Sequence, residues 1–203
     1  MKNIMPQTDL PPTNAQTHFV NGQSLQPPWP DNMQVIGLAM GCFWGAERLF
    51  WSIPGVHVTR VGYQGGHQEN PNYGQVCQKI TGHTETVQVV FDPARVSLEQ
   101  LLSVFWEGHD PTQGDAQGND RGPQYRSMIF TQSSQQQDIT EASQQRVQVQ
   151  LREMGLGSIT TKIELNAKFW MAEEEHQQYL AKNPGGYCGL SGTGLVCDIP
   201  VSA

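Results

Sequence analysis

Clustered basic residues are missing from this sequence. Its 12 lysines and arginines are scattered along the chain and are outnumbered by 19 aspartates and glutamates, which gives a formal net charge of −7. Because nucleic-acid binding takes most of its affinity from clustered Lys and Arg side chains, this charge argues against a nucleic-acid partner.

Long hydrophobic runs are missing as well. No uninterrupted apolar stretch approaches the ~20 residues that a membrane-spanning helix requires, and the N-terminus lacks the apolar core of a signal peptide. We therefore expect no membrane partner and a cytoplasmic location. With 203 residues, 37% of them hydrophobic, the chain has room for the core of one domain but not of two, and we expect a monomer.

Cysteine is scarce, with four residues at positions 42, 77, 188 and 197. They are too few and too unevenly spread for a secreted fold held by disulfides, and a reducing compartment would keep them as thiols. Their spacing matches no common Cys-x-x-Cys pattern, so we expect no metal and no cofactor. Thiol chemistry is what remains to be examined.

The composition divides the chain into three segments. Residues 1–32 are rich in Pro, Gln, Asn and Thr, with apolar side chains too sparse to bury a face, and predict a loosely ordered arm that could lie over the domain. Residues 33–184 carry the patterns of regular structure and would form the catalytic domain. Residues 185–203 form a Gly-rich tail that carries two of the cysteines.

Strands and helices alternate within residues 33–184. Strands are predicted at residues 33–40, 56–63, 84–91, 125–131 and 159–165. Helices are predicted at residues 43–51, 97–108 and 171–182, together with a Gln-rich helix that ends before Gly155. This alternation predicts an α/β (α+β) two-layer sandwich, in which helices pack against one mixed β-sheet with long coil segments at both ends.

Cys42 falls where the first strand gives way to a helix. Unpaired backbone N–H groups and the helix dipole favour a thiolate there, which would lower the pKa of the thiol. The adjacent Phe43 and Trp44 suggest an apolar pocket. The plainer interpretation is a buried structural thiol, because cysteine is among the most buried residue types.

The segment Gly41-Cys42-Phe43-Trp44-Gly45 matches the signature of the A-type peptide methionine sulfoxide reductases. The resemblance continues in family order through residues 62–66, 70–73, 81–85, 109–111, 118–122, 124–127, 176–180 and 186–189. It implies a ferredoxin-like core and an oxidoreductase that returns methionine S-sulfoxide, protein-bound or free, to methionine. It also implies thioredoxin as the reductant.

The resemblance assigns roles around the sulfoxide. Cys42 would be the nucleophile and Glu85 the proton donor, because a carboxyl among apolar residues has a raised pKa and can hold a proton near neutrality. Tyr73 and Tyr125 would hydrogen-bond the sulfoxide oxygen. Without the resemblance, Glu85 would be an exposed strand residue and the two tyrosines ordinary half-buried side chains.

Three further residues would bind the substrate. Phe43 and Trp44 would form an apolar wall for its methyl group, and Asp120 would orient its backbone or an active-site partner. Core packing for the aromatics and an Asx turn for Asp120 are the plainer alternatives. Glu47 could be a structural hydrogen-bond partner and stays outside the catalytic set.

Oxygen transfer would leave Cys42 as a sulfenic acid, which condenses with a nearby thiol. By resemblance to three-cysteine members of the family, Cys188 would form this disulfide and Cys197 would move it outward to Cys188–Cys197, where thioredoxin could reduce it. Two-cysteine members also exist, so the need for Cys197 stays open. Cys77 lies outside these motifs and would be a non-catalytic thiol.

Three other functions compete with this hypothesis. A cysteine hydrolase would pair Cys42 with His83, His109 or His176 and would have no use for the tail cysteines. A binding module would hold zinc through Cys188, Cys197 and nearby histidines. A general peroxidase would use the thiolate without an aromatic wall or a carboxylic acid.

Overall fold

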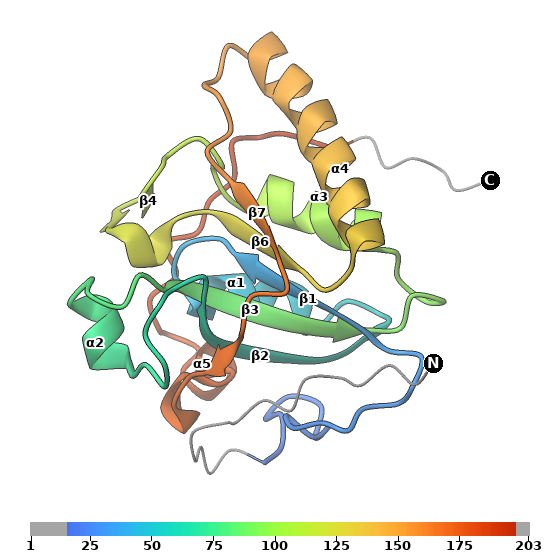
Figure 1. Ribbon diagram of the computed structural model, residues 1–203, viewed down its shortest axis with the longest axis vertical. Helices are drawn as coiled ribbons and strands as arrows, with labels where there is room; N and C mark the ends of the chain where they lie inside the picture. Colours follow the sequence, from blue (N-terminus) through green and yellow to red (C-terminus); the bar gives the residue numbers. More distant parts are fainter. Residues whose placement is uncertain (1–15, 198–203) are drawn as a thin grey trace.

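The computed structural model describes residues 16–197 of the protein. Its main sheet has six strands in the order β7-β6-β1-β3-β2-β8, and Figure 1 shows their arrangement. The strands are β1 (Gln34–Ala39), β2 (Val56–Gln64), β3 (Thr84–Phe91), β6 (Met128–Thr131), β7 (Lys162–Leu165) and β8 (Trp170–Met171). A separate two-stranded ribbon pairs β4 (Ala116–Gln117) with β5 (Asp120–Arg121).

The helices interleave with these strands along the chain. The α-helices are α1 (Phe43–Phe50), α2 (Tyr73–Cys77), α3 (Leu98–Gly108), α4 (Ser134–Glu153) and α5 (Tyr179–Lys182). The short 3₁₀ segments are η1 (Pro123–Tyr125) and η2 (Glu174–His176). Among the described residues, no helix combines the length and the apolar character that crossing a bilayer would take.

The central strands have the ferredoxin-like arrangement. The order β1-α1-β2-β3-α3-β6 along the chain is a βαββαβ unit, and its strands lie as β6-β1-β3-β2, all antiparallel. β7 pairs with β6 in parallel, which makes the sheet mixed. The predicted α/β sandwich with a mixed sheet and packed helices is confirmed.

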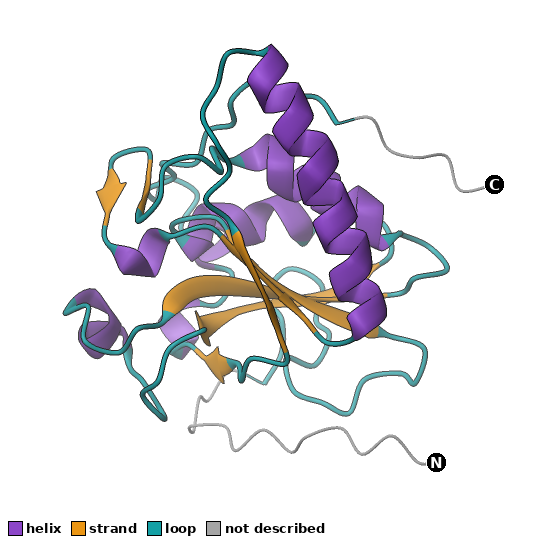
Figure 2. Ribbon diagram, turned by 45° about the horizontal axis from the view of Figure 1, so that its top comes forward, coloured by secondary structure: helices purple, strands orange, loops and turns teal. Residues whose placement is uncertain are grey.

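One face of the sheet forms the main core under the helices. Alternate residues of each strand point to it, because successive side chains of a strand point to opposite faces. Ile36, Leu38, Val87 and Val89 are fully buried there with Phe105 of α3. Figure 2 shows the longer helices on one side of the sheet.

The N-terminal segment covers the opposite face. Leu25 is fully buried against Val58, Val90 and Phe169, and the Arg60 guanidinium donates to the Leu25 carbonyl at 3.0 Å. Residues 16–32 are therefore held on the sheet at Leu25, where the sequence predicted a loosely ordered arm that could lie over the domain. A few well-placed contacts hold them, and an irregular segment has no periodicity that would reveal such contacts. The first 15 residues of the expected arm lie outside the described residues.

Two strands begin later than expected, and one helix was not expected. The expected strand at residues 125–131 begins only at Met128, and Tyr125 lies in η1. The strand expected at residues 159–165 begins at Lys162. α2 was not expected, and a capping box between Asn72 and Gln75 starts it inside a stretch taken for a loop.

The helix expected over residues 171–182 is replaced by β8, η2 and α5. The reason is Gln177, which is fully buried and donates from its side-chain amide to the carbonyls of Val61 and Ala172. Its side-chain oxygen accepts the Val61 N–H. This glutamine joins the segment to β2 and prevents a continuous helix.

Candidate active site

Cys42 is the N-cap residue of α1, as predicted. β1 ends at Ala39, and Gly41 makes the turn with a φ of +95°, a conformation that favours glycine. Cys42 has no side-chain cap hydrogen bond, and its thiol is near the backbone N–H groups of Trp44 and Gly45. The first turn of α1 thus points its unpaired donors at the sulfur.

The electrostatics of Cys42 differ from the expectation. Burial raises the pKa of the thiol, and the negative charge of Glu85 raises it further. The N–H groups of Trp44 and Gly45 act in the opposite direction without overcoming these effects. The helix N-terminus therefore does not lower the pKa on balance, because desolvation of the thiolate is the larger effect.

Glu85 lies at the start of β3 and is 1% exposed. It pairs across the sheet with Tyr63, and its Oε2 accepts the Phe43 N–H at 3.0 Å. Burial raises the pKa of the carboxyl to about 8, Asp120 adds to the rise, and the Phe43 hydrogen bond opposes it. The alternative of an exposed strand residue is wrong, and Glu85 carries a proton near neutral pH.

Tyr73 and Tyr125 approach the same carboxyl from two other elements. Tyr73 begins α2, and Tyr125 ends η1. Burial is the main cause that raises the pKa of both hydroxyls, and the charge of Glu85 adds to it. Both hydroxyls therefore keep their protons and can donate hydrogen bonds. The structure thus brings together Cys42, Glu85 and the two tyrosines predicted from the sequence.

Trp44 contacts two rings to which the sequence analysis gave no role in the reductase site. Its Nε1 donates to Nδ1 of His176 at 3.2 Å. Its indole stacks on Tyr179, with centroids 3.8 Å apart and planes 15° apart. The ring centroids of Phe43 and His176 are 5.3 Å apart. Phe43 is only 1% exposed, so it is also a core residue. His176 and Tyr179 lie in the matched segment 176–180, which was the available signal.

Glu173 is a second residue that the sequence analysis missed. Its Oε2 accepts the Tyr63 hydroxyl at 2.8 Å, and its Oε1 accepts the Tyr73 N–H at 2.8 Å. This carboxylate joins β2 to the start of α2, and so fixes the backbone position of Tyr73. No motif marked it.

The tail lies along α1 and α3. A Cβ on Gly45 would lie 2.9 Å from the Sγ of Cys188, and Arg48 donates to that sulfur at 3.1 Å. Cys188 is thus packed one helical turn from Cys42. Cys197 lies farther along, where its N–H donates to Glu107 at 2.8 Å.

The remaining predicted residues also lie near the site. Asp120, in β5, accepts the Tyr187 hydroxyl at 3.3 Å and contributes to the charge around Cys42 and Glu85. Cys77 is hydrogen-bonded to the Tyr73 side chain, and burial is the main cause that raises its pKa. Cys77, which was expected to be a non-catalytic thiol, adjoins one of the predicted site tyrosines. All four cysteines are thiols.

The histidines do not form a hydrolase pair with Cys42 among the described residues. His83 contacts the Gln68 carbonyl, and His109 contacts the Phe105 carbonyl and the Ser127 hydroxyl. His176 receives the Trp44 hydrogen bond instead. Within residues 16–197, no three His, Cys, Asp or Glu side chains are arranged to hold a metal ion.

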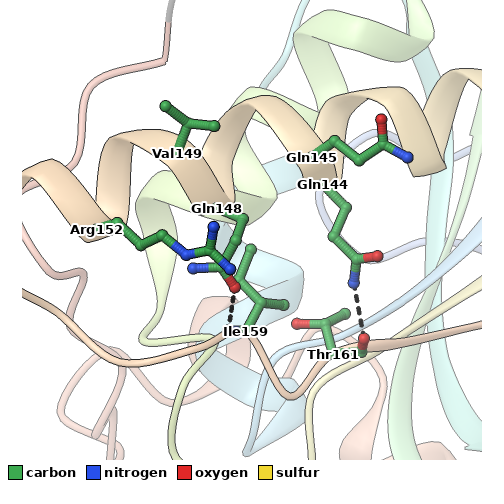
Figure 3. Close-up of a pocket in the computed structure, with 7 residues that line it drawn as sticks. All are labelled: Gln144, Gln145, Gln148, Val149, Arg152, Ile159 and Thr161. Carbon is green, nitrogen blue, oxygen red and sulfur yellow. Dashed lines mark hydrogen bonds between the residues drawn. The ribbon is translucent and has the colours of Figure 1, made fainter.

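A polar groove of about 510 Å³ lies away from these residues, between α4 and residues 159–161. Its glutamines bond to the opposite wall, Gln148 accepting from the Ile159 N–H and Gln144 donating to the Thr161 carbonyl, as Figure 3 shows. None of the predicted site residues lines it.

The site places a cysteine at a helix N-terminus beside a buried carboxyl, an arrangement typical of enzymes that use a thiol. Residues 34–195 match the family model described as peptide methionine sulfoxide reductase. A relative named peptide methionine sulfoxide reductase MsrA, from Brucella anthropi, is 54% identical over 99% of this chain and 95% of its own length.

Solved structures agree with this match. Methionine sulfoxide reductase A of Corynebacterium diphtheriae has a TM-score of 0.77 and 42% identity, covering 97% of this chain and 94% of that one. Reduced Mxr1 from Saccharomyces cerevisiae has a TM-score of 0.71 and 32% identity, covering 80% of this chain and 92% of that one. The chain belongs to the peptide methionine sulfoxide reductase family and is an oxidoreductase.

Proposed function

We propose that the chain reduces the S epimer of methionine sulfoxide, in proteins or as the free amino acid, through Cys42. The observation that carries the proposal is the buried Glu85 carboxyl, whose pKa of about 8 lets it hold a proton beside the N-terminus of α1. A sulfoxide oxygen must gain a proton as its bond to sulfur breaks, and this acid can supply it. The S preference rests on the family resemblance.

The first half-reaction transfers one oxygen atom. The Cys42 thiolate attacks the sulfoxide sulfur while Glu85 gives its proton to the oxygen, to which the Tyr73 and Tyr125 hydroxyls donate hydrogen bonds. The oxygen then passes to Cys42, leaving a sulfenic acid and the methionine thioether. Cys42 releases its thiol proton to solvent when the thiolate forms, and Glu85 takes one proton from solvent after the transfer, so protons balance. Trp44 receives the methyl group, and Asp120 orients the substrate.

The second half-reaction removes the oxygen as water. The Cys188 thiol attacks the sulfenic sulfur, forms the Cys42–Cys188 disulfide and releases water. The position of the Cys188 Sγ against Gly45 supports this pairing. Cys197 then attacks the Cys188 sulfur, which frees Cys42 and leaves a Cys188–Cys197 disulfide. In this scheme residues 33–184 catalyse the oxygen transfer, and the tail returns Cys42 to its reduced form.

Thioredoxin would reduce the final disulfide. Mxr1 of Saccharomyces cerevisiae has been solved in complex with Trx2, and that relative has the fold of this chain. A dithiol partner suits the proposed Cys188–Cys197 disulfide, because both cysteines lie in the tail and outside residues 33–184.

The test is reduction of the separated S and R epimers of a methionine sulfoxide peptide with dithiothreitol, comparing the parent with Cys42→Ser. Reduction of the S epimer alone, absent in the variant, supports the proposal. If folded, reduced parent protein acts on neither epimer, or if Cys42→Ser keeps the activity, the proposal fails.

A further inference from the structure

Glu47 is fully buried on α1, one turn beyond Phe43, and takes no part in the reaction proposed above. Its Oε1 accepts the Thr59 hydroxyl at 3.0 Å and the Gln178 amide at 2.7 Å. Its Oε2 accepts the Gln178 backbone N–H at 2.8 Å. A buried carboxyl with three hydrogen bonds fixes the atoms that donate to it, because each of them would otherwise be left unpaired.

Gln178 is the residue that Glu47 fixes most firmly. Its backbone φ is +49°, a left-handed conformation that is uncommon for a non-glycine residue. It is the N-cap of α5, and Tyr179 follows it directly. Tyr179 stacks on Trp44, and His176 on the other side of Gln178 accepts the Trp44 N–H. The two contacts that hold Trp44 therefore depend on where Gln178 sits.

The N-terminal segment completes the same network from the other side. His18 is 1% exposed, and its Nε2 lies 3.0 Å from the Thr59 hydroxyl. Its Nδ1 faces the N–H groups of Val20 and Asn21, which fixes the ring as the Nε2–H tautomer that donates to Thr59. The next residue, Phe19, donates its N–H to the Gln178 side-chain oxygen at 3.0 Å. Residues 18 and 19 thus reach both Thr59 and Gln178.

We infer that Glu47 and residues 18–19 are positioning residues for the substrate wall, acting on Trp44 through Thr59 and Gln178. None of them touches the reacting atoms. The inference rests on the proposed function in one respect, namely that Trp44 receives the substrate methyl group. It gives the N-terminal segment a role in substrate affinity in addition to covering the sheet.

Thr59→Val removes the hydroxyl that joins His18 to Glu47 and keeps the shape of the side chain. Thr59→Ser restores the hydroxyl and is the matched control. Single-turnover reduction at varied substrate concentration separates the apparent Kd from the maximal rate. We expect Thr59→Val to raise the apparent Kd about fivefold, as loss of one buried hydrogen bond would. The maximal rate should stay within about twofold, because Cys42 and Glu85 are untouched.

A second readout does not use catalysis. Amide hydrogen exchange of residues 176–182 should accelerate in Thr59→Val and not in Thr59→Ser, because Gln178 is held less firmly. A folded Thr59→Val protein with parental Kd and parental exchange in this segment would overturn the inference. An inactive parent would instead refute the proposed function, so the two failures are distinguishable.

His18→Ala keeps the inference testable should Thr59→Val not fold. It removes the outer donor and leaves the bond from Thr59 to Glu47. His57→Ala, a histidine on the same strand as Thr59, is the control. We expect a smaller rise in the apparent Kd for His18→Ala and none for His57→Ala, and equal values for the two variants would contradict the inference.

Discussion

The Sγ of Cys188 lies where a side chain on Gly45 would have to go, and Arg48 on the next turn of α1 donates to that sulfur at 3.1 Å. Cys42 begins the same helix. The proposed nucleophile and its proposed disulfide partner therefore both lie at the same helix, α1, in the reduced protein. We therefore expect that a short movement of the tail brings the two sulfurs together.

Gly45→Ala should slow disulfide formation by about tenfold or more, because the new Cβ would displace the Cys188 sulfur and overpacking of this kind costs roughly 1–3 kcal/mol. The first oxygen transfer should remain, so sulfenic acid should accumulate on Cys42. Trapping with dimedone after one turnover measures it. Ala46→Gly, on the same helix, is the control for a change in helix propensity. Parental disulfide kinetics in Gly45→Ala would contradict the proposed packing.

Cys188→Ser should release one methionine per enzyme and then stop when thioredoxin is the reductant, because the thiol proposed to form the disulfide with Cys42 is missing. A rapid-quench count of methionine against active Cys42 measures this. Cys77→Ser is the matched control and should keep repeated turnover. Sustained turnover in Cys188→Ser would refute the relay.

The pH dependence of the first step should change in Glu85→Gln. The reacting form needs a thiolate at Cys42 and a proton on Glu85, so it holds one proton between two coupled groups. In the parent, the single-turnover rate should rise with pH to about 8, where the first proton leaves, and then level off. Glu85→Gln should be slower by roughly 10²–10⁴-fold near neutrality and should show no break near that pH. An unchanged profile would remove Glu85 from the reaction.

The contribution of Glu85 to the parent's stability should depend on pH in the opposite direction from that of a salt-bridged acid. Burial raises the pKa of Glu85 from 4.5 to about 8, so over this window the folded protein holds a proton that the unfolded chain has released. The parent's free energy of unfolding should therefore fall as pH rises, by at most about 1.4 kcal/mol per pH unit from this group. The contribution of Glu85 to the free energy of unfolding is fully present below pH 4.5 and is lost above about pH 8.

Urea denaturation at intervals between about pH 5 and 9 measures this effect. Glu85→Gln should gain stability relative to the parent as pH rises. Glu47, whose pKa burial raises to about 7, is present in both proteins and cancels in the difference. Glu141→Gln, on the exposed side of α4, is the control. A constant difference between parent and Glu85→Gln would show that the buried carboxyl does not change its proton on unfolding.

Local sequence signals predicted the parts of the fold that depend on neighbouring residues. Ser97 and Gln100 form the capping box that starts α3, as their spacing indicated. The position of Cys42 between β1 and α1 followed from the apolar run and the glycine before it. These features depend on contacts within a few residues, which a sequence displays directly.

The rest depended on contacts between distant segments. Gln177 and Gln178 look like the exposed face of a helix, but their amides bond to β2 and to Glu47. The burial of Glu85 depends on α1 and β2 closing over it, and only the resemblance pointed to that residue. The raised pKa of Cys42 has the same origin, because helix position is readable from sequence and desolvation is not.

The two edges of the sheet have a consequence for the proposed action on methionine sulfoxide in proteins. β8 has two residues and β7 has four, so the strands at both borders present little unpaired backbone. Extended segments of another chain can add to an open sheet edge and start aggregation. A reductase that must approach such segments side chain by side chain benefits from borders too short to pair with their backbones.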